Sequence, residues 1–490
     1  MKKLFFLLFS FFLIVSCNDN DDNVSITDPR GGIPANLDVQ DFIWKGLNFY
    51  YFWQGDVPNL ADDRFATEEE YITYLSNFSN PESFFSDELL FSEDRFSFIT
   101  SDYNELLDSQ QGVFKSNGVE FGLVKFSNSD DVFGYVRYIV PGSDAATKNI
   151  QRGDIFVGVD GQTLNVNNFS DLLFGESDVY TLNMADIANN TITANNQEVT
   201  LTKTELTENP VFISKTIDIN GAKIGYLMYN GFTRTFDQQL NDAFGQFKAD
   251  GITDLVLDLR YNPGGSVSTA IALSSMITGQ FNGDLFSKER WNSRLQAMLG
   301  DQNVSNFFTN QLDDGTPINN LNLNKVYVIA LGSSASASEL VINALNPYIN
   351  VIHIGERTRG KNEASITLLD DFGRGSPFPY IDRTISNLNP NHTYGMQPLV
   401  LRSENAVGFF DYTDGLVPDV AISEDLENLG VLGETNEPLL SRAIFEITGV
   451  FGKTALREPL MPIKAMTDSK MFLPTRDNMY VDLEKMTTQN

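Results

Sequence analysis

The chain has 490 residues, 42% of them hydrophobic, so we expect two to four domains rather than one core. It carries 65 acidic and 34 basic residues and a net charge of -31, which argues against a nucleic-acid partner, because such a partner calls for a basic patch. Cys17 is the only cysteine, which excludes a disulfide within one chain, and no metal or cofactor motif occurs, so we expect no cofactor and no metal.

Residues 1–16 predict a secretory leader. Lys2 and Lys3 precede an apolar run, Leu4 to Val15, that is too short to span a bilayer. Residues 14–17, Ile-Val-Ser-Cys, resemble the bacterial lipobox, in which the cysteine is lipidated; the alternative is a plain signal peptide with a chance cysteine. The resemblance implies lipidation at Cys17 and a lipid-anchored outer-membrane lipoprotein of the cell envelope, periplasmic or surface-exposed. Residues 17–36 are polar and acidic, which is typical of a flexible tether.

Residues 37–108 predict a helical N-terminal domain. Apolar side chains recur at helical spacing from Val39 to Tyr51, and 68–78 and 103–107 form further helical pieces. Four aromatic residues cluster near the end of the first helix: Trp44, Tyr50, Tyr51 and Trp53. Such a cluster is typical of a core, with ligand binding as the alternative.

Residues 109–205 contain a glycine turn followed by an alternating, strand-like run, Gly118 to Val124. The segments 138–146 (YIVPGSDAA) and 151–161 (QRGDIFVGVDG) resemble those of PDZ domains. The resemblance implies a β-sandwich-like PDZ domain in which a peptide C-terminus adds a strand to a sheet edge. Its carboxylate loop would be Val119, Glu120, Phe121 and Gly122. The alternative is a buried strand without a ligand.

The next segments predict alternating strands and helices, with strands over 222–229 and 254–259 and helices over 236–247 and 267–277. Gly264 and Gly265 lie between the second strand and the second helix. Because glycine has no side chain, its backbone N–H can approach a substrate carbonyl closely, so this turn is a candidate oxyanion site. The alternative is a plain tight turn.

A strand, a sharp turn and a helix surround Ser336. The strand is predicted over 326–331, the helix ends at Asn346-Pro347, and a second strand over 350–354 leads to Lys361. A serine at a helix start lies beside free backbone N–H groups, but it needs a base to act as a nucleophile. A lysine can be that base only if burial lowers its pKa. The alternative is an ordinary crossover with a solvated lysine.

Several motifs in this part of the chain occur in a characteristic order. They are DLRYNPGG (258–265), SASASE (334–339), GERTRGK (355–361) and GLVPD (415–419), with Lys361 lying 25 positions after Ser336. Together they resemble the C-terminal processing (tail-specific) serine peptidases. The resemblance implies that residues 206–455 form an α/β, crotonase-like serine protease domain. It makes Ser336 the nucleophile and Lys361 the general base, with backbone N–H groups of Gly264 or Gly265 and of Ala337 as the oxyanion hole.

One position departs from the pattern of that family. Ser365 stands where a glutamine usually follows the lysine by four residues, so its shorter hydroxyl is the candidate orienting residue for Lys361. The departure keeps open a non-catalytic lipoprotein that binds peptides or proteins through the PDZ groove. A purely structural lipoprotein is a third alternative. A Ser-His-Asp triad is a weaker hypothesis, because His353 lies in an apolar strand and His392 in a polar loop.

The sequence thus predicts a multidomain α+β and α/β protein, a serine endopeptidase that acts on protein or peptide substrates of the cell envelope. Further strands are expected over 365–368, 399–401 and 407–412. The extension over 456–490 receives no role.

Overall fold

The structure is a computed structural model that describes residues 32–126, 129–371, 378–450 and 463–482. The expected leader, Cys17 and most of the tether lie outside the described residues. No helix in the described ranges is both long enough and apolar enough to cross a membrane.

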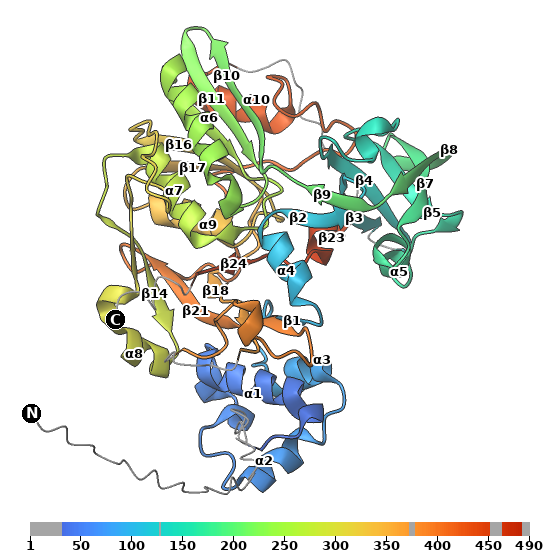
Figure 1. Ribbon diagram of the computed structural model, residues 1–490. Helices are drawn as coiled ribbons and strands as arrows, with labels where there is room; N and C mark the ends of the chain where they lie inside the picture. The colour runs from blue at the N-terminus through green and yellow to red at the C-terminus, as the bar shows by residue number, and fades with distance from the viewer. Residues whose placement is uncertain (1–31, 127–128, 372–377, 451–462, 483–490) are drawn as a thin grey trace, which may run out of the picture.

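The N-terminal part is a small helical layer at one end of the molecule (Figure 1). It contains α1 (Asp38–Tyr50), α2 (Glu68–Leu75), α3 (Pro81–Ser83) and the helical turn η4 (Phe84–Leu89). Thr67 caps α2 by accepting a hydrogen bond from the Glu70 N–H, which satisfies a free donor at the helix start. Tyr50 and Tyr51 are fully buried, and Trp53 stacks on Phe91, so the aromatic cluster belongs to the core.

A second part is built on a strongly bent antiparallel sheet. Its own strands are β3 (Val119–Phe126), β4 (Val132–Ile139), β5 (Ile155–Val159), β6 (Gln162–Thr163), β7 (Val179–Ala188) and β8 (Thr191–Thr202). The short helix α5 (Phe169–Phe174) packs on the same apolar core as β3. A two-stranded ribbon, β2 (Val113–Ser116) with β9 (Thr204–Thr207), lies beside this sheet, and α4 (Tyr103–Gln110) leads into it.

The third part is a three-layer α/β unit. Its sheet has the order β10-β11-β12-β16-β17-β22, antiparallel at the first pair and parallel elsewhere. The strands are β10 (Val211–Ile219), β11 (Ala222–Tyr229), β12 (Asp254–Asp258), β16 (Lys325–Ala330), β17 (Asn350–Gly355) and β22 (Val420–Ala421).

Alternation along β11 explains the two covering layers. Leu227 and Tyr229 join the core that includes α6 (Asp237–Asp250), α7 (Val267–Thr278) and α9 (Ala337–Leu345), whereas Tyr226 and Met228 join the core of α10 (Pro438–Thr448). Successive side chains of a strand point to opposite faces, so one apolar strand builds both interfaces.

A further sheet joins this unit to the helical layer. Its order is β13-β24-β18-β21-β14-β15, from β13 (Gly265–Ser266), β24 (Met479–Tyr480), β18 (Glu363–Ser365), β21 (Leu399–Asn405), β14 (Leu285–Trp291) and β15 (Ser305–Phe307). α8 (Ser293–Asn303) follows β14, and the small sheet β1-β20-β19 pairs β1 (Phe98–Thr100), β20 (Gly395–Gln397) and β19 (Leu368–Leu369).

The expected strand over 407–412 is wrong. The chain there is a loop, because the Asn405 side chain accepts hydrogen bonds from the backbone N–H groups of Val407 and Phe409 and so takes donors that a strand would use. The coarser expectation, a mixed α/β architecture with an N-terminal helical part, is confirmed.

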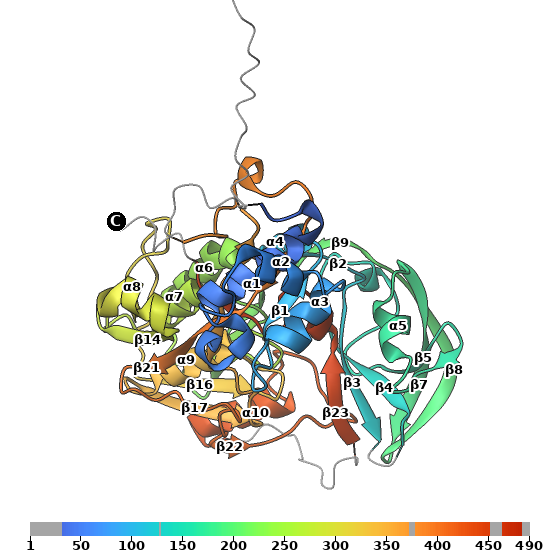
Figure 2. The same cartoon turned by 90° about the horizontal axis from the view of Figure 1, so that it is seen from below.

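The described C-terminal residues, 463–482, pair with strands of two other parts of the molecule. β23 (Ile463–Asp468) adds an antiparallel strand to β3 (Figure 2), and β24 lies between β13 and β18 in its sheet. One short segment therefore completes two sheets that belong to different parts of the molecule.

Candidate active site

Three of the four sequence motifs meet at one edge of the central sheet. The turn with Gly264 and Gly265 follows β12, the turn with Ser336 follows β16, and Lys361 follows β17. These strands are parallel neighbours, so their carboxyl ends lie at the same edge, where α/β folds commonly bind their ligands.

The serines around Ser336 tie its turn to the neighbouring one. Ser333 and Ser334 donate hydrogen bonds to the carbonyl oxygens of Arg260 (2.8 Å) and Leu259 (2.7 Å). Ser338 donates to the carbonyl of Asn262 at 3.0 Å. The serine-rich composition is thus partly structural, because three hydroxyls hold the two turns together.

Ser336 is held in an unusual conformation at the start of α9. Its φ is +64° and its ψ is -115°, a region that costs a residue with a side chain roughly 1–3 kcal/mol. The side chain is fully buried, and its hydroxyl oxygen has no hydrogen-bond partner among the described residues. A strained backbone and an unbonded hydroxyl are properties of a group positioned for chemistry rather than for stability.

Glu339 connects the serine to the lysine. Its Oε2 accepts hydrogen bonds from the backbone N–H groups of Ser336 (2.7 Å) and Lys361 (2.9 Å). Its Oε1 accepts from the Gly360 N–H (2.7 Å) and the Thr358 hydroxyl (2.5 Å). Burial raises the pKa of Glu339 to about 7, and these four donors oppose that shift.

Glu339 is the last residue of the SASASE motif, but the motif by itself predicted no role for it. The available signal was its position three residues after a helix N-cap, where a carboxylate reaches back to the cap N–H.

Lys361 is 1% exposed. Burial lowers the pKa of its amine from 10.5 to about 8, and the carboxylates of Asp477 and Glu363 partly offset this shift. Nζ donates a hydrogen bond to the carbonyl oxygen of Asp477 at 2.7 Å and lies 5.0 Å from the ring centre of Phe96. A lysine in this environment is readily neutral near pH 8 and can accept a proton.

Ser365 is buried in β18, and its hydroxyl makes no hydrogen bond to the described residues. The structure therefore does not join Ser365 to the Lys361 amine, which donates to Asp477 instead.

The glycine turn adopts a backbone conformation that only glycine accepts without strain. Gly264 and Gly265 have φ values of +110° and +136°, where a side chain would be strained. A Cβ on Gly264 would lie 2.7 Å from Cβ of Ser336, so the two turns touch. The Gly264 N–H donates to Oδ1 of Asn262 at 2.9 Å. Of the two candidate oxyanion donors in this turn, the Gly265 N–H is therefore the one not used by Asn262.

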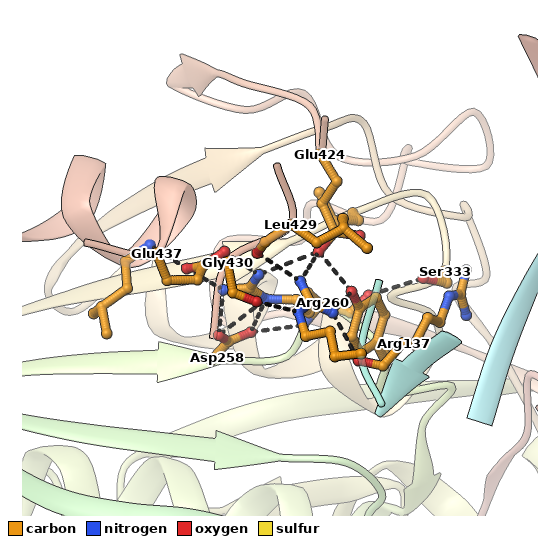
Figure 3. A network of polar contacts seen from close by, with 12 residues as sticks. Arg137, Asp258, Arg260, Ser333, Glu424, Leu429, Gly430 and Glu437 are labelled. Atoms are coloured by element: carbon orange, nitrogen blue, oxygen red, sulfur yellow. Dashed lines mark hydrogen bonds and ion pairs between the residues drawn. The ribbon is translucent and has the colours of Figure 1, made fainter. Parts of the chain in front are cut away.

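A buried ion network surrounds Arg260, which lies between β12 and the glycine turn in the sequence (Figure 3). The Arg260 guanidinium is fully buried and binds the carboxylates of Asp258 (2.8 Å) and Glu437 (2.7 Å). Glu424 also contacts Arg260 and pairs with Arg152 at 2.7 Å. Burial alone would raise the pKa of Glu424, but the two arginines lower it to about 2.

The predicted carboxylate loop lies at the start of β3, and another segment of the chain covers it. Val119, Glu120, Phe121 and Gly122 are all buried. The Phe121 N–H donates to the Ser469 hydroxyl at 3.0 Å, and that hydroxyl donates to the Glu120 carboxylate at 2.7 Å.

The two histidines make contacts elsewhere. His353 Nε2 lies 3.3 Å from the carbonyl oxygen of Ala330, and His392 Nε2 pairs with Asp370 at 2.9 Å. Asp371 accepts hydrogen bonds from the Tyr380 and Asp382 N–H groups. Within the described ranges, no group of three or more His, Cys, Asp or Glu residues could hold a metal ion.

Comparisons with known proteins place these features in context. Residues 223–374 match the model of peptidase family S41, and residues 38–98 match that of the peptidase S41 N-terminal domain. The chain is 28% identical over 236 residues to the chloroplastic C-terminal processing peptidase of Tetradesmus obliquus, covering 45% of this chain and 46% of that protein. It is 33% identical over 146 residues to a carboxy-terminal-processing protease of Bartonella bacilliformis, covering 28% and 29%.

Among solved structures, the chain resembles the "Putative S41 protease" from Bacteroides fragilis. The identity is 27%, the TM-score is 0.64, and the match covers 84% of this chain and 98% of the other. The chain spans about half the length of the curated relatives it matches first.

Proposed function

We propose that this chain is a serine endopeptidase of peptidase family S41, in which Ser336 is the nucleophile and Lys361 the general base. The observation that carries the proposal is the environment of Lys361. Its amine is buried, and burial lowers the pKa of this amine to about 8. The backbone N–H groups of Lys361 and Ser336 both donate to the Glu339 carboxylate. A base whose pKa lies close to the working pH transfers protons efficiently.

The reaction follows from these positions. Ser336 Oγ attacks the peptide carbonyl, while the neutral Lys361 amine accepts its proton and later delivers a proton to the leaving amine. Backbone N–H groups of Gly265 and Ala337 stabilise the oxyanion; the loss of one such donor typically costs roughly 2.7–4 kcal/mol of barrier. Water then hydrolyses the acyl-enzyme, with Lys361 as the base. Ser365 stays the predicted orienting residue for the amine once the amine faces Ser336.

The proposal extends to substrate binding. Residues 109–205 are interpreted as a PDZ domain and 206–455 as a crotonase-like protease domain, with 37–108 as the helical N-terminal domain. The groove beside β3 and α5 combines an apolar wall with the edge of β3 that pairs with β23 in this structure, and addition of an extended strand at such an edge is the way these domains bind peptide C-termini. Unstructured protein segments are the substrate class that fits both the groove and the catalytic cleft, which is the space around Ser336, Lys361 and the glycine turn.

The location is proposed from the sequence alone. Lipidation of Cys17 would anchor the enzyme to the outer membrane and direct it to proteins of the cell envelope. Cys17→Ser in the full chain is expected to move the protein from the membrane fraction to the soluble fraction. An unchanged membrane fraction would contradict the anchor.

Cleavage of casein by the chain lacking residues 1–17 tests the activity, with Ser336→Ala as the matched control. Cleavage by the unsubstituted form alone supports the proposal. Equal cleavage by both would place the activity elsewhere, and peptide binding without cleavage would favour a non-catalytic binding protein.

A further inference from the structure

The C-terminal segment 463–482 binds the β3 edge as a peptide ligand would. β23 runs antiparallel to β3, with Ile463 opposite Phe126 and Asp468 opposite Gly122. This is strand addition, the mode by which an extended peptide gains backbone hydrogen bonds from a sheet edge. In Figure 2, β23 lies beside β3, on the side of β3 that faces the α/β unit with α10.

Side chains of this segment fill the groove beside that edge. Met466 packs on the core shared by β3 and α5. The ring of Phe472 stacks on that of Phe174 in α5, with ring centres 3.5 Å apart and planes 7° apart. Asp468 forms an ion pair with Arg137 on β4 at 2.9 Å. Apolar contact, stacking and charge pairing thus all favour this occupant.

Ser469 occupies the position at the predicted carboxylate loop that the terminal carboxylate of a peptide would take. The Phe121 N–H, which would serve a terminal carboxylate, donates to the Ser469 hydroxyl. The next residue, Lys470, is 7% exposed and donates to the Asn230 carbonyl at 2.7 Å. The segment therefore binds the groove and then continues toward the cleft.

The same segment then enters the catalytic cleft. The Asp477 carbonyl accepts the hydrogen bond from the Lys361 amine, and the Asp477 carboxylate pairs with Arg359 at 2.9 Å. The carbonyl oxygen of Asn478 lies so close to Gly264 that a Cβ on this glycine would clash with it, and Ser336 lies on the same side. Met479 then pairs with Gly265 in parallel register.

These contacts are incompatible with turnover. Catalysis requires the Lys361 amine to face Ser336, but the amine is bound to the segment, and the serine hydroxyl has no hydrogen-bond partner in the part of the chain that the structure describes. The segment also pairs with the glycine that would supply an oxyanion donor. A substrate could enter neither the groove nor the cleft while the segment is in place.

We propose that residues 463–482 are a resident ligand of this enzyme, which occupies the peptide groove and the catalytic cleft in cis and which a substrate polypeptide must displace. This proposal rests on the proposed function of the site. A tethered segment has an effective concentration of order millimolar, so even a modest intrinsic affinity suppresses turnover about tenfold or more.

Binding of a synthetic peptide tests the proposal without any need for catalysis. A fluorescent peptide of residues 463–482 is titrated against two Ser336→Ala proteins, one complete after residue 17 and one ending at Val450. The shortened protein is expected to bind the peptide saturably and the complete one at least about tenfold more weakly, because its own segment competes. Equal binding by both proteins, or no binding by a shortened protein with native circular dichroism, would overturn the proposal.

Activity gives the second measurement. With Ser336 present, removal of residues 451–490 is expected to raise casein turnover about tenfold or more, and the added peptide to reverse the increase. If neither form cleaves casein, the peptidase proposal fails, and the binding experiment still decides whether the segment is a ligand.

A full-length variant covers the case in which the shortened chain does not fold. Phe472→Asp removes the stacking on Phe174, and the matched control is Ile385→Asp, which changes an apolar side chain that is 83% exposed in the short helix η7 (Ile385–Asn387). Binding of the peptide in trans by the Ser336→Ala form is expected to rise several-fold with Phe472→Asp and to stay unchanged with the control. Equal binding by the two variants would overturn the proposal.

Discussion

Two buried cations lie close to the same edge of the central sheet, and their surroundings differ sharply. Arg260 is fully buried and directly paired with Asp258 and Glu437. Lys361 is 1% exposed, and no carboxylate of the described residues forms an ion pair with its amine, which binds a carbonyl oxygen and faces an aromatic ring.

The difference distinguishes a cation with a structural role from a cation suited to proton transfer. A guanidinium keeps its charge at any ordinary pH, so its burial is tolerated only with paired carboxylates. An amine can lose its proton instead, and burial without a direct ion pair brings the pKa of Lys361 down to about 8. The ion-paired arginine therefore fits a structural role, and the lysine without an ion pair fits proton transfer.

Replacement of Lys361 is expected to have the largest effect on activity. Lys361→Ala should lower casein turnover by about 10²–10⁴-fold, because the general base is lost, while the thermal transition stays close to that of the unsubstituted protein. Lys203→Ala is the control, since burial also lowers the pKa of Lys203 but its amine binds the Gly175 carbonyl in another part of the molecule. Near-normal turnover by Lys361→Ala would exclude the dyad.

Replacement of Arg260 is expected to act on folding instead. Arg260→Met leaves two buried carboxylates unpaired and should lower the free energy of unfolding by about 3–5 kcal/mol in urea titrations. Arg442→Met, which removes a surface pair with Glu446 one helical turn away, should cost less than about 1 kcal/mol. Similar losses of unfolding free energy in the two variants would contradict a structural role for the buried Arg260 network.

Glu339→Gln is expected to lower turnover by about 10–100-fold, because charge-assisted hydrogen bonds to the Ser336 and Lys361 backbones weaken. The carboxylate also raises the pKa of Lys361, so its removal should shift the pH midpoint of activity downward. A merely structural role would lower turnover and leave that midpoint unchanged. Thr358→Val, which removes one donor to the same carboxylate, is the milder comparison.

The pH dependence of the unsubstituted enzyme follows from the same lysine. Below its pKa the amine is charged and cannot accept a proton, so kcat/KM should rise about tenfold per pH unit up to about pH 8 and then level off. Assays from pH 5.5 to pH 9.5 would detect the rise. A flat profile across this range would contradict a lysine base.

Ser365→Ala is expected to have the smallest effect, a decrease of less than about fivefold. Its hydroxyl makes no hydrogen bond to the described residues while the C-terminal segment occupies the cleft, so it can contribute only after the amine has moved. A loss as large as that of Lys361→Ala would show that orientation of the amine depends on this serine.

Local pattern predicted much of the α/β unit. Apolar β-branched runs identified β12, β16 and β17, and a serine followed by an amphipathic run identified the start of α9. The order of the strands also brought Gly264, Ser336 and Lys361 to one edge, as parallel strands require. Polar partners far along the chain were not predicted, because Glu437 is 177 residues from Arg260 and no periodicity connects them.

The sequence by itself determined which residues are candidates for chemistry in this protein, because the proposed nucleophile, the proposed base and the glycine turn depend on residue type and on short-range spacing. Only the tertiary structure decided which segment of the chain contacts these residues. The C-terminal extension has no local signal for binding, yet it donates one strand to β3 and another to β13 and places the Asp477 carbonyl on the Lys361 amine. Strand addition uses backbone groups that every residue has, so the partner of a sheet edge is chosen by tertiary packing and not by local sequence.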